Sequence, residues 1–387
     1  MAFSKAVMSR PPGRALDEPI GLNDTVKRLY NNNTKSDFSE VLEQAVLANV
    51  RQSITADTVF AVDHTDISKK YAKKMENLAV VRDGDAGTFG LGYNQVVITA
   101  TQPGEANPTI MANTIFSKTA TPDATITGET QGMLSRIRAE HGSSGVRACD
   151  RFFDSKSYYK FFTAADEDYV IRAKTNRRLF AVSNNRIVPD KKDIVTLAEE
   201  CKTPLKCQVK KWKNGEWQST VTVKVGSRKV FLPCINKIIT LVVVKGFGKI
   251  PMMLLTNIDV SSKNLILLQR ILQIYRARWA CEEYIRFVKA SYTMEDVRCL
   301  CCQALKNTLA FLTFANDFVT RHLGRNEAIK PMRIKILARA RAVFEDHAKL
   351  HLYRLCAGIK CLLQSIPASY RQMSSNSKIN LQLELLL

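Results

Sequence analysis

The spacing of apolar side chains changes several times along the chain, and each change predicts a different kind of element. Residues 38–54 place apolar side chains at helical intervals, which predicts a small helical unit near the start. Short apolar runs follow at 59–63, 91–100, 146–150 and 168–174, and each of them predicts a buried strand. The chain therefore passes early from helical periodicity to strand periodicity.

The segments around these strands carry turn and helix signals. Residues 101–130 are rich in Thr, Pro and Gly, which predicts a loop, and a helix is expected over 131–141. Residues 205–247 alternate apolar and polar side chains about an Asn-Gly pair at 214–215, which is typical of a β-hairpin. Two further apolar runs, at 238–246 and 251–258, have the character of buried strands.

From Asn264 onward the pattern is almost wholly helical, with loops expected at 323–330 and 366–380. This order predicts an α/β fold in which a mixed-sheet core is interrupted by a β-rich insertion and flanked by helical parts. The expected units are a small helical N-terminal unit at 1–56, the first part of the core at 57–180, a basic β-rich insertion at 181–247, the second part of the core at 248–320, and a basic helical region at 321–387.

Composition narrows the class of protein. The chain has 387 residues, 45% of them apolar, so it can bury a sizeable core, and disorder is excluded. It contains no apolar run of the roughly 18 residues that a membrane span needs. Pro11 and Pro12 interrupt the N-terminus before the apolar core of a signal peptide could form. We therefore expect a cytoplasmic protein.

Positive charge is concentrated in two segments. The formal net charge is +21, yet residues 1–58 carry seven basic and seven acidic side chains. Residues 171–250 carry 18 basic and 5 acidic side chains, and residues 301–387 carry 13 and 5. A surplus of this size favours a polyanionic partner over an acidic protein or a neutral metabolite. The alternative is a solvated basic surface without a partner.

Cysteine usage points to free thiols. The ten cysteines are irregularly spaced and do not describe a disulfide scaffold. The densest group is Cys299, Cys301 and Cys302, and zinc ligation there is the alternative interpretation. The five histidines that could complete a zinc site are scattered along the chain, so free thiols in a reducing compartment are favoured.

Three segments place carboxylates where they could act together. Asp63 and Asp150 each follow a predicted strand, and Glu282 shares one face of a predicted helix at 274–289 with Tyr275, Arg278 and Lys289. Two aspartates and a glutamate brought together would bind two Mg²⁺ ions through hard oxygen ligands. Such a pair of ions stabilises both the attacking and the leaving oxygen of a phosphodiester displacement.

Each carboxylate also has an alternative interpretation. Asp66 could be the residue of interest in the first segment, or it could cap a helix beginning one residue later. Asp154 stands in the same relation to Asp150 and could cap the helix that follows it. Glu283 lies off the face that carries Arg278 and Lys289, and a surface ion pair is the alternative for that face. His64 beside the first aspartate is interpreted as positional and not as a general base.

Together these segments resemble the bacterial insertion-sequence DDE transposases of the Tyr-Arg-Glu-Lys signature group, which have an RNase-H-like core. The signature Y-x2-R-x3-E-x6-K is matched at every spacing over 275–289. A D-x-T block stands at 63–65 and a D-R-x-x-D block at 150–154. The resemblance covers roughly residues 57–320. Phe152 is a departure, because many relatives have glycine there, and it leaves the conformation of that loop open.

The resemblance implies a cut-and-paste DNA transposase in a bacterial, nucleoid-associated setting. Asp63, Asp150 and Glu282 would be the catalytic metal ligands, holding two Mg²⁺ ions for which Mn²⁺ could substitute. The partner would be double-stranded DNA, both the terminal inverted repeats and the target, held by a homodimer. The alternatives are a domesticated, non-catalytic DNA-binding protein and an RNase-H-like nuclease without strand transfer.

DNA contacts are predicted from the same resemblance and from the basic segment. Trp212 is set among lysines and could stack on an unpaired base, or it could pack against Trp217 across a hairpin. The stretch at 169–177 also resembles the family. The residues predicted to contact DNA are Tyr275, Arg278, Lys289, Arg172, Lys174, Lys210, Lys211, Trp212 and Lys213.

Overall fold

The computed structural model describes most of the chain, namely residues 22–82, 87–104, 108–213, 216–292, 294–297, 299–323, 327–341, 354–359 and 361. Between 210 and 219 only the backbone is described, without 214–215. The predicted Asn-Gly turn and the predicted loop at 366–380 therefore lie outside the described residues, as does the first part of the predicted N-terminal unit.

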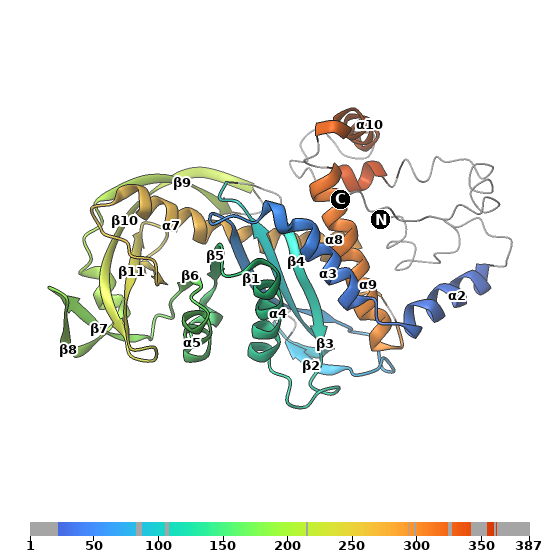
Figure 1. Ribbon diagram of the computed structural model, residues 1–387, viewed down its shortest axis with the longest axis horizontal. Coiled ribbons are helices and arrows are strands. Elements are labelled where there is room, and N and C mark those ends of the chain that lie inside the picture. Colours follow the sequence, from blue (N-terminus) through green and yellow to red (C-terminus); the bar gives the residue numbers. More distant parts are fainter. Residues whose placement is uncertain are drawn as a thin grey trace.

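One large mixed sheet forms the centre of the described structure (Figure 1). Its 12 strands follow the order β2-β3-β1-β5-β6-β12-β11-β10-β7-β8, with β4 beside β3 and β9 beside β10. In chain order the strands are β1 (Val59–Ser68), β2 (Ala79–Arg82), β3 (Phe89–Thr101), β4 (Thr109–Phe116), β5 (Val146–Cys149), β6 (Asp168–Arg172), β7 (Arg178–Ser183), β8 (Arg186–Asp193), β9 (Leu205–Lys213), β10 (Glu216–Leu232), β11 (Lys237–Lys245) and β12 (Met252–Thr256).

Five of these strands have the arrangement of an RNase-H-like core. Strands β4, β3 and β1 are neighbours and antiparallel to one another. On the other side of β1, strand β5 runs parallel to it, and β6 runs parallel to β5. A meander of three antiparallel strands followed by two parallel ones is the mixed sheet of this fold, so the predicted fold class is confirmed.

The β-rich segment extends this sheet at its other end. Strand β12 pairs antiparallel with β6, and β11, β10 and β7 follow in sequence across the sheet. Strands β9 and β10 form the predicted hairpin, in which Trp212 stands opposite Trp217 in the backbone register. The basic strands are therefore continuous with the core through backbone hydrogen bonds.

Helices cover both faces of the sheet (Figure 1). Buried side chains of α3, α4, α5 and α6 pack against one face, and those of α7, α8 and α9 pack against the other. The α-helices are α2 (Leu22–Lys35), α3 (Ser39–Val50), α4 (Ile126–His141), α5 (Lys156–Ala164), α6 (Ile194–Glu199), α7 (Leu265–Ala277), α8 (Trp279–Tyr292), α9 (Cys302–Asp317) and α10 (Lys330–Arg341).

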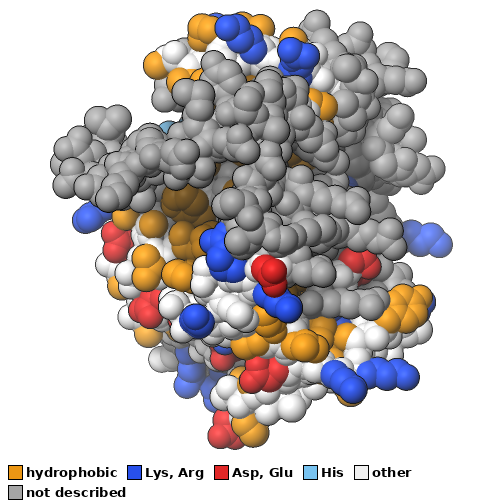
Figure 2. Space-filling model, turned by 90° about the vertical axis from the view of Figure 1, so that its right-hand side faces the viewer, with side chains coloured by type: hydrophobic (Ala, Val, Ile, Leu, Met, Phe, Trp, Pro, Cys, Tyr) orange, Lys and Arg blue, Asp and Glu red, His pale blue; other side chains and the backbone are white. Residues whose placement is uncertain are grey.

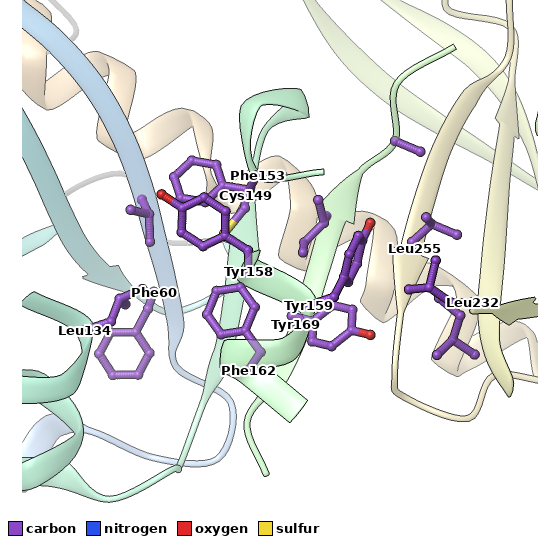
Figure 3. Packing of buried hydrophobic residues seen from close by; sticks show 14 of the residues in the cluster. Phe60, Leu134, Cys149, Phe153, Tyr158, Tyr159, Phe162, Tyr169, Leu232 and Leu255 are labelled. Carbon is purple, nitrogen blue, oxygen red and sulfur yellow. The ribbon is translucent and has the colours of Figure 1, made fainter. Parts of the chain in front are cut away.

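Alternation along β1 assigns its side chains to these two layers. Phe60 and Val62 belong to the core cluster that contains α4 and α5, and Figure 3 shows Phe60 near Leu134 of α4. Ala61 and Ile67 belong to the cluster formed with α8 and α9. Because successive strand residues point to opposite faces, odd-numbered residues of β1 face α8 and even-numbered ones face α4 and α5.

Two sequence predictions about the segment 101–130 were wrong. Strand β4 lies within the predicted loop, because its apolar residues are buried on both faces and show no clear alternation. Helix α4 begins at Ile126, five residues before the predicted start, and the Thr125 hydroxyl caps it by accepting a hydrogen bond from the Gly128 N–H at 3.0 Å. The hairpin of β7 and β8 was also not predicted.

The described N-terminal helices dock on α9. The Asn307 side-chain amide donates hydrogen bonds of 2.7 Å to the carbonyl oxygens of Asn33, in the last turn of α2, and of Ser36, which follows α2. None of the helices that the structure describes is both long and apolar enough to cross a membrane. On the face shown in Figure 2, the Lys and Arg side chains that are coloured are spread among apolar and acidic ones, and some lie at the top, where α10 is.

Candidate active site

Asp63 and Asp150 lie at equivalent points of two paired strands. The parallel pairing of β1 with β5 runs from Val59 opposite Val146 to Val62 opposite Cys149. Each aspartate is the next residue of its own strand or strand end, so both carboxylates lie at the same edge of the pair. The strand that carries Asp63 is longer than predicted. It was expected to end at Asp63, but β1 continues to Ser68.

Arg278 connects the first aspartate to Glu282. One terminal nitrogen of its guanidinium donates to Asp63 Oδ2 at 3.3 Å, and the other donates to Glu282 Oε1. The three side chains are largely buried, with exposed fractions of 11% for Arg278, 18% for Asp63 and 28% for Glu282. The structure therefore brings Asp63 and Glu282 together around one cation, and Asp150 lies close enough to Asp63 to act on its charge.

The predicted helix at 274–289 is interrupted at Arg278. Helix α7 ends at Ala277 and α8 begins at Trp279, so Tyr275 and Glu282 belong to different helices. The interruption is one residue long, and Arg278 itself keeps a helical backbone conformation. The turn places the Arg278 guanidinium 5.8 Å from the centre of the Tyr275 ring and still within reach of both carboxylates.

The electrostatics of the cluster reflect crowded negative charge. Burial raises the pKa of Asp63 to about 6, Arg278 opposes this rise, and the nearby carboxylates of Asp150 and Glu282 add to it. Burial alone would lower the pKa of Arg278, but Tyr275, Glu282 and Asp63 together raise it. Arg278 therefore stays charged, and the cluster holds more negative charge than one guanidinium can neutralise.

The alternative carboxylates Asp66, Asp154 and Glu283 have surroundings that differ from those of Asp63, Asp150 and Glu282. Asp66 is buried within β1, which does not give way to a helix, so the helix-cap interpretation was wrong. Asp154 is also buried, and Ser155, not Asp154, occupies the cap position of α5. The Asp154 carboxylate accepts hydrogen bonds from Tyr159 Oη, Lys174 N and Arg177 Nε. The Glu283 carboxylate accepts hydrogen bonds from the Trp279 ring and Arg286.

His64 lies on the opposite face of β1 from Asp63. Its Nε2 is 2.8 Å from the Thr130 hydroxyl, and that hydroxyl donates its own proton to the Ile126 carbonyl oxygen at 2.6 Å. Nε2 must therefore carry the imidazole proton and donate to Thr130. Burial lowers the pKa of His64 to about 4, which keeps the ring neutral. These contacts agree with a positional role.

The other predicted contacts are placed at different depths. Tyr275 is buried among the apolar residues around α7. Lys289 Nζ forms an ion pair with Glu295 at 3.3 Å, and its side chain is 20% exposed. Arg172 is the last residue of β6 and Lys174 follows closely, so both lie at the strand edge that carries Asp150, because β5 and β6 are parallel.

The site also depends on residues that the sequence did not single out. Lys69 is buried, and its ammonium donates to the carbonyl oxygens of Met294 and Val297 at 2.6 Å each. These bonds hold the end of β1 against the segment that follows α8, the two elements that carry Asp63 and Glu282. No local sequence signal distinguishes Lys69 from the other lysines nearby, because its partners are backbone carbonyls far along the chain.

The donor set suits a hard divalent cation, although the cluster is organised around Arg278. Carboxylate oxygens are the ligands that Mg²⁺ and Mn²⁺ prefer, and the excess negative charge at Asp63 favours a cation. As they stand, no three His, Cys, Asp or Glu side chains in the described part of the chain are grouped closely enough to hold a metal ion. All ten cysteines are free thiols.

The family of the chain follows from comparison of its sequence with known families. A model of the transposase DDE domain matches residues 54–315, which include all three carboxylates and Arg278, and the chain belongs to this family. The protein is therefore a transposase of the DDE class. The curated proteins contain no match to the chain.

Among solved structures, the chain has a distant likeness to the piggyBac transposase synaptic complex with hairpin DNA, determined by cryo-electron microscopy. The identity is 8% and the TM-score 0.39, over 83% of this chain and 54% of the other. The chain thus spans about half the length of that protein. The likeness is weak, and the assignment of the class rests on the family match.

Proposed function

We propose that this transposase cleaves DNA at the ends of a bacterial insertion sequence and joins the ends to target DNA by a cut-and-paste mechanism. The observation that carries the proposal is that Asp63 and Asp150 share one end of the paired strands β1 and β5, while Arg278 links Asp63 to Glu282 of α8. Membership of the DDE family supports it. The match to the Tyr-Arg-Glu-Lys signature supports placement in that group.

The proposed roles follow from position. Asp63, Asp150 and Glu282 would hold two Mg²⁺ ions, which supply charge stabilisation to the attacking and leaving oxygens of an in-line displacement. Arg278, once released from the carboxylates, is placed to contact the scissile phosphate as a planar donor. The Tyr275 ring lies against the Arg278 guanidinium and would support it. Lys289 would contact the DNA backbone beside the scissile phosphate.

The remaining surface would hold DNA outside the reacting bond. Arg172 and Lys174 lie at the same strand edge as Asp150. The β9–β10 hairpin, with Lys210, Lys211, Trp212 and Lys213, belongs to the most basic segment of the chain. We propose that this hairpin binds the end of the element. We also propose that a homodimer pairs two such ends, and that the domains have the boundaries predicted from the sequence.

The experiment is a cleavage and joining assay on the DNA that flanks the gene. Purified protein is incubated with labelled terminal inverted repeats and a target plasmid, with Mg²⁺ or with EDTA. We expect Mg²⁺-dependent cuts at the repeat ends and joined products. Cleavage without joining would favour a nuclease, and binding without cleavage would favour a domesticated DNA-binding protein. Full cleavage in EDTA would contradict the metal-dependent mechanism.

A further inference from the structure

Arg278 is a buried cation with one donor left unused. Its two terminal nitrogens donate to Asp63 Oδ2 and to Glu282 Oε1. Its Nε is buried as well, but it has no hydrogen-bond partner among the described residues. A buried N–H without an acceptor is costly, so the two carboxylates do not satisfy the guanidinium completely. The arrangement leaves a donor for a further acceptor.

The same guanidinium occupies carboxylate oxygens that a divalent cation would use. One of these oxygens comes from β1 and the other from α8. Arginine keeps its charge at every physiological pH, so Arg278 cannot leave the oxygens by losing a proton. An ion that arrives there must either displace the guanidinium or bind beside a positive charge. Both alternatives weaken the binding of the ion.

A phosphate would satisfy the guanidinium better than the two carboxylates do. Arginine binds phosphate through a fork of two parallel N–H bonds, and a phosphodiester offers two oxygens for such a fork. Nε and one terminal nitrogen form a fork of this kind, and Nε is the donor that the carboxylates leave unused. A phosphodiester can therefore compensate Arg278 for the loss of Asp63 and Glu282.

We propose that Arg278 is an internal counter-ion that makes binding of the divalent cation conditional on DNA. In the free protein it neutralises Asp63 and Glu282. When a phosphodiester of bound DNA takes the guanidinium, the two carboxylates bind the ion without this competition. DNA and the ion then each raise the affinity for the other by the same factor. This proposal rests on the proposed function, since it requires DNA and a divalent ion at the carboxylates.

The test measures the affinity for Ca²⁺ by titration calorimetry, with and without a duplex that carries the terminal repeat. Ca²⁺ is used because its looser coordination shell allows binding with little turnover. The heat of Ca²⁺ binding to the duplex alone is subtracted. We expect the wild-type protein to bind Ca²⁺ at least about tenfold more tightly in the DNA complex than when free. Free Arg278→Gln should bind Ca²⁺ about tenfold more tightly than free wild type, so DNA should add correspondingly less.

Two controls separate Arg278 from other effects of DNA. Arg286→Gln removes a cation that pairs with Glu283 outside the cluster, and it should keep the full effect of DNA. A second duplex carries an uncharged methylphosphonate in place of the scissile phosphate, whose position the cleavage assay gives. It should still bind the wild-type protein but lose most of the effect on Ca²⁺ affinity. Because this control uses the wild-type protein, it tests the proposal even if Arg278→Gln does not fold.

The outcomes distinguish this proposal from the proposed function. An equal effect of DNA on Ca²⁺ affinity in wild type and Arg278→Gln would overturn the role of Arg278 alone. The full effect with the methylphosphonate duplex would do the same. A wild-type protein that does not bind the repeat duplex, or that binds Ca²⁺ neither free nor with DNA, would instead overturn the proposed function.

Discussion

Arg278 donates a hydrogen bond to Asp63 across 215 positions of the chain, and the same guanidinium bonds Glu282 one helical turn away. A single cation therefore holds together carboxylates from a strand and from a helix. A divalent ion bound by these two carboxylates would compete with Arg278 for the same oxygens.

Removing the guanidinium should strengthen binding of divalent cations. In Arg278→Gln the carboxylates lose their internal counter-ion, so we expect Mn²⁺ to bind about tenfold more tightly, on the scale of one partly buried charge pair. Titration calorimetry in the absence of DNA measures this. Arg286→Gln is the control, because Arg286 pairs with Glu283 outside the cluster, and its affinity should not change. Weaker binding of Mn²⁺ by Arg278→Gln would refute the competition.

The three carboxylates should be needed for cleavage and not for DNA binding. We expect Asp63→Ala, Asp150→Ala and Glu282→Ala to reduce single-turnover cleavage at least about a thousandfold, since each removes a ligand and its charge stabilisation. Glu283→Ala is the matched control, one residue from Glu282, and should cleave normally. Substantial cleavage by Asp150→Ala would mean that the second ligand has been assigned to the wrong aspartate.

The neighbouring aspartate should matter for stability instead. Asp154 is buried and accepts bonds from Tyr159, Lys174 and Arg177. Asp154→Ala would leave the Arg177 charge without its buried partner, so we expect a loss of about 3 kcal/mol in the free energy of unfolding. Urea denaturation measures the loss, with Asp150→Ala as the comparison. A similar small change in both variants would contradict the division of roles.

Stability should depend on pH through Asp63. Its pKa is about 6 in the folded protein, above the ordinary value near 3.8. The folded protein therefore binds a proton more tightly than the unfolded chain, and this contribution to stability is lost as the pH rises from about 4 to about 6. Asp63→Asn lacks the titrating group, so its stability relative to wild type should increase over that interval, by about 2 kcal/mol.

Chemical denaturation of wild type and Asp63→Asn in EDTA, at several pH values between about 4 and about 6, measures the difference in their free energies of unfolding. His141→Gln serves as a titratable control, because burial lowers the pKa of His141, well away from the carboxylates. A difference between Asp63→Asn and wild type that does not change with pH would show that Asp63 is ionised normally in the folded protein.

The basic hairpin should set the salt dependence of DNA binding. We expect replacement of Lys210, Lys211 and Lys213 with Ala to weaken binding similarly for all sequences. Each lost phosphate contact should lower the slope of log affinity against log salt by about 0.9. A salt titration measures the slope, with Lys27, Arg28 and Lys35 of α2 replaced together as the control. An unchanged slope in the hairpin variant would place the grip elsewhere, for example in 301–387.

The shared position of Asp63 and Asp150 could be predicted from the sequence, because local rules place both at strand ends. Asp63 and Asp150 follow apolar runs that pair in parallel, so their common edge follows from the order of strands alone. The alternation at 205–247 likewise predicted the β9–β10 hairpin. Strand β4 was missed because a strand buried on both faces has no alternation to detect.

The arrangement around the carboxylates could not be predicted in the same way. The turn at Arg278 breaks a helical pattern without a glycine or a proline, so spacing alone suggested one continuous face. The contact of Arg278 with Asp63, like that of Lys69 with Met294, joins segments more than two hundred residues apart. Such contacts depend on the packing of α8 against β1, which no local pattern encodes.

Because side chains alternate along β1, the face of the sheet on which Asp63 lies depends on its exact position in the strand. Asp63 faces α8 and Arg278, and His64, the very next residue, faces Thr130 on the other side of the sheet. Deleting or inserting one residue early in β1 would turn the carboxylate into the aromatic layer and the imidazole toward Arg278. A shift by two residues would restore the facing. It would also move the carboxylate about 7 Å along the strand, away from Arg278, so both the facing and the distance constrain the length of β1 before Asp63.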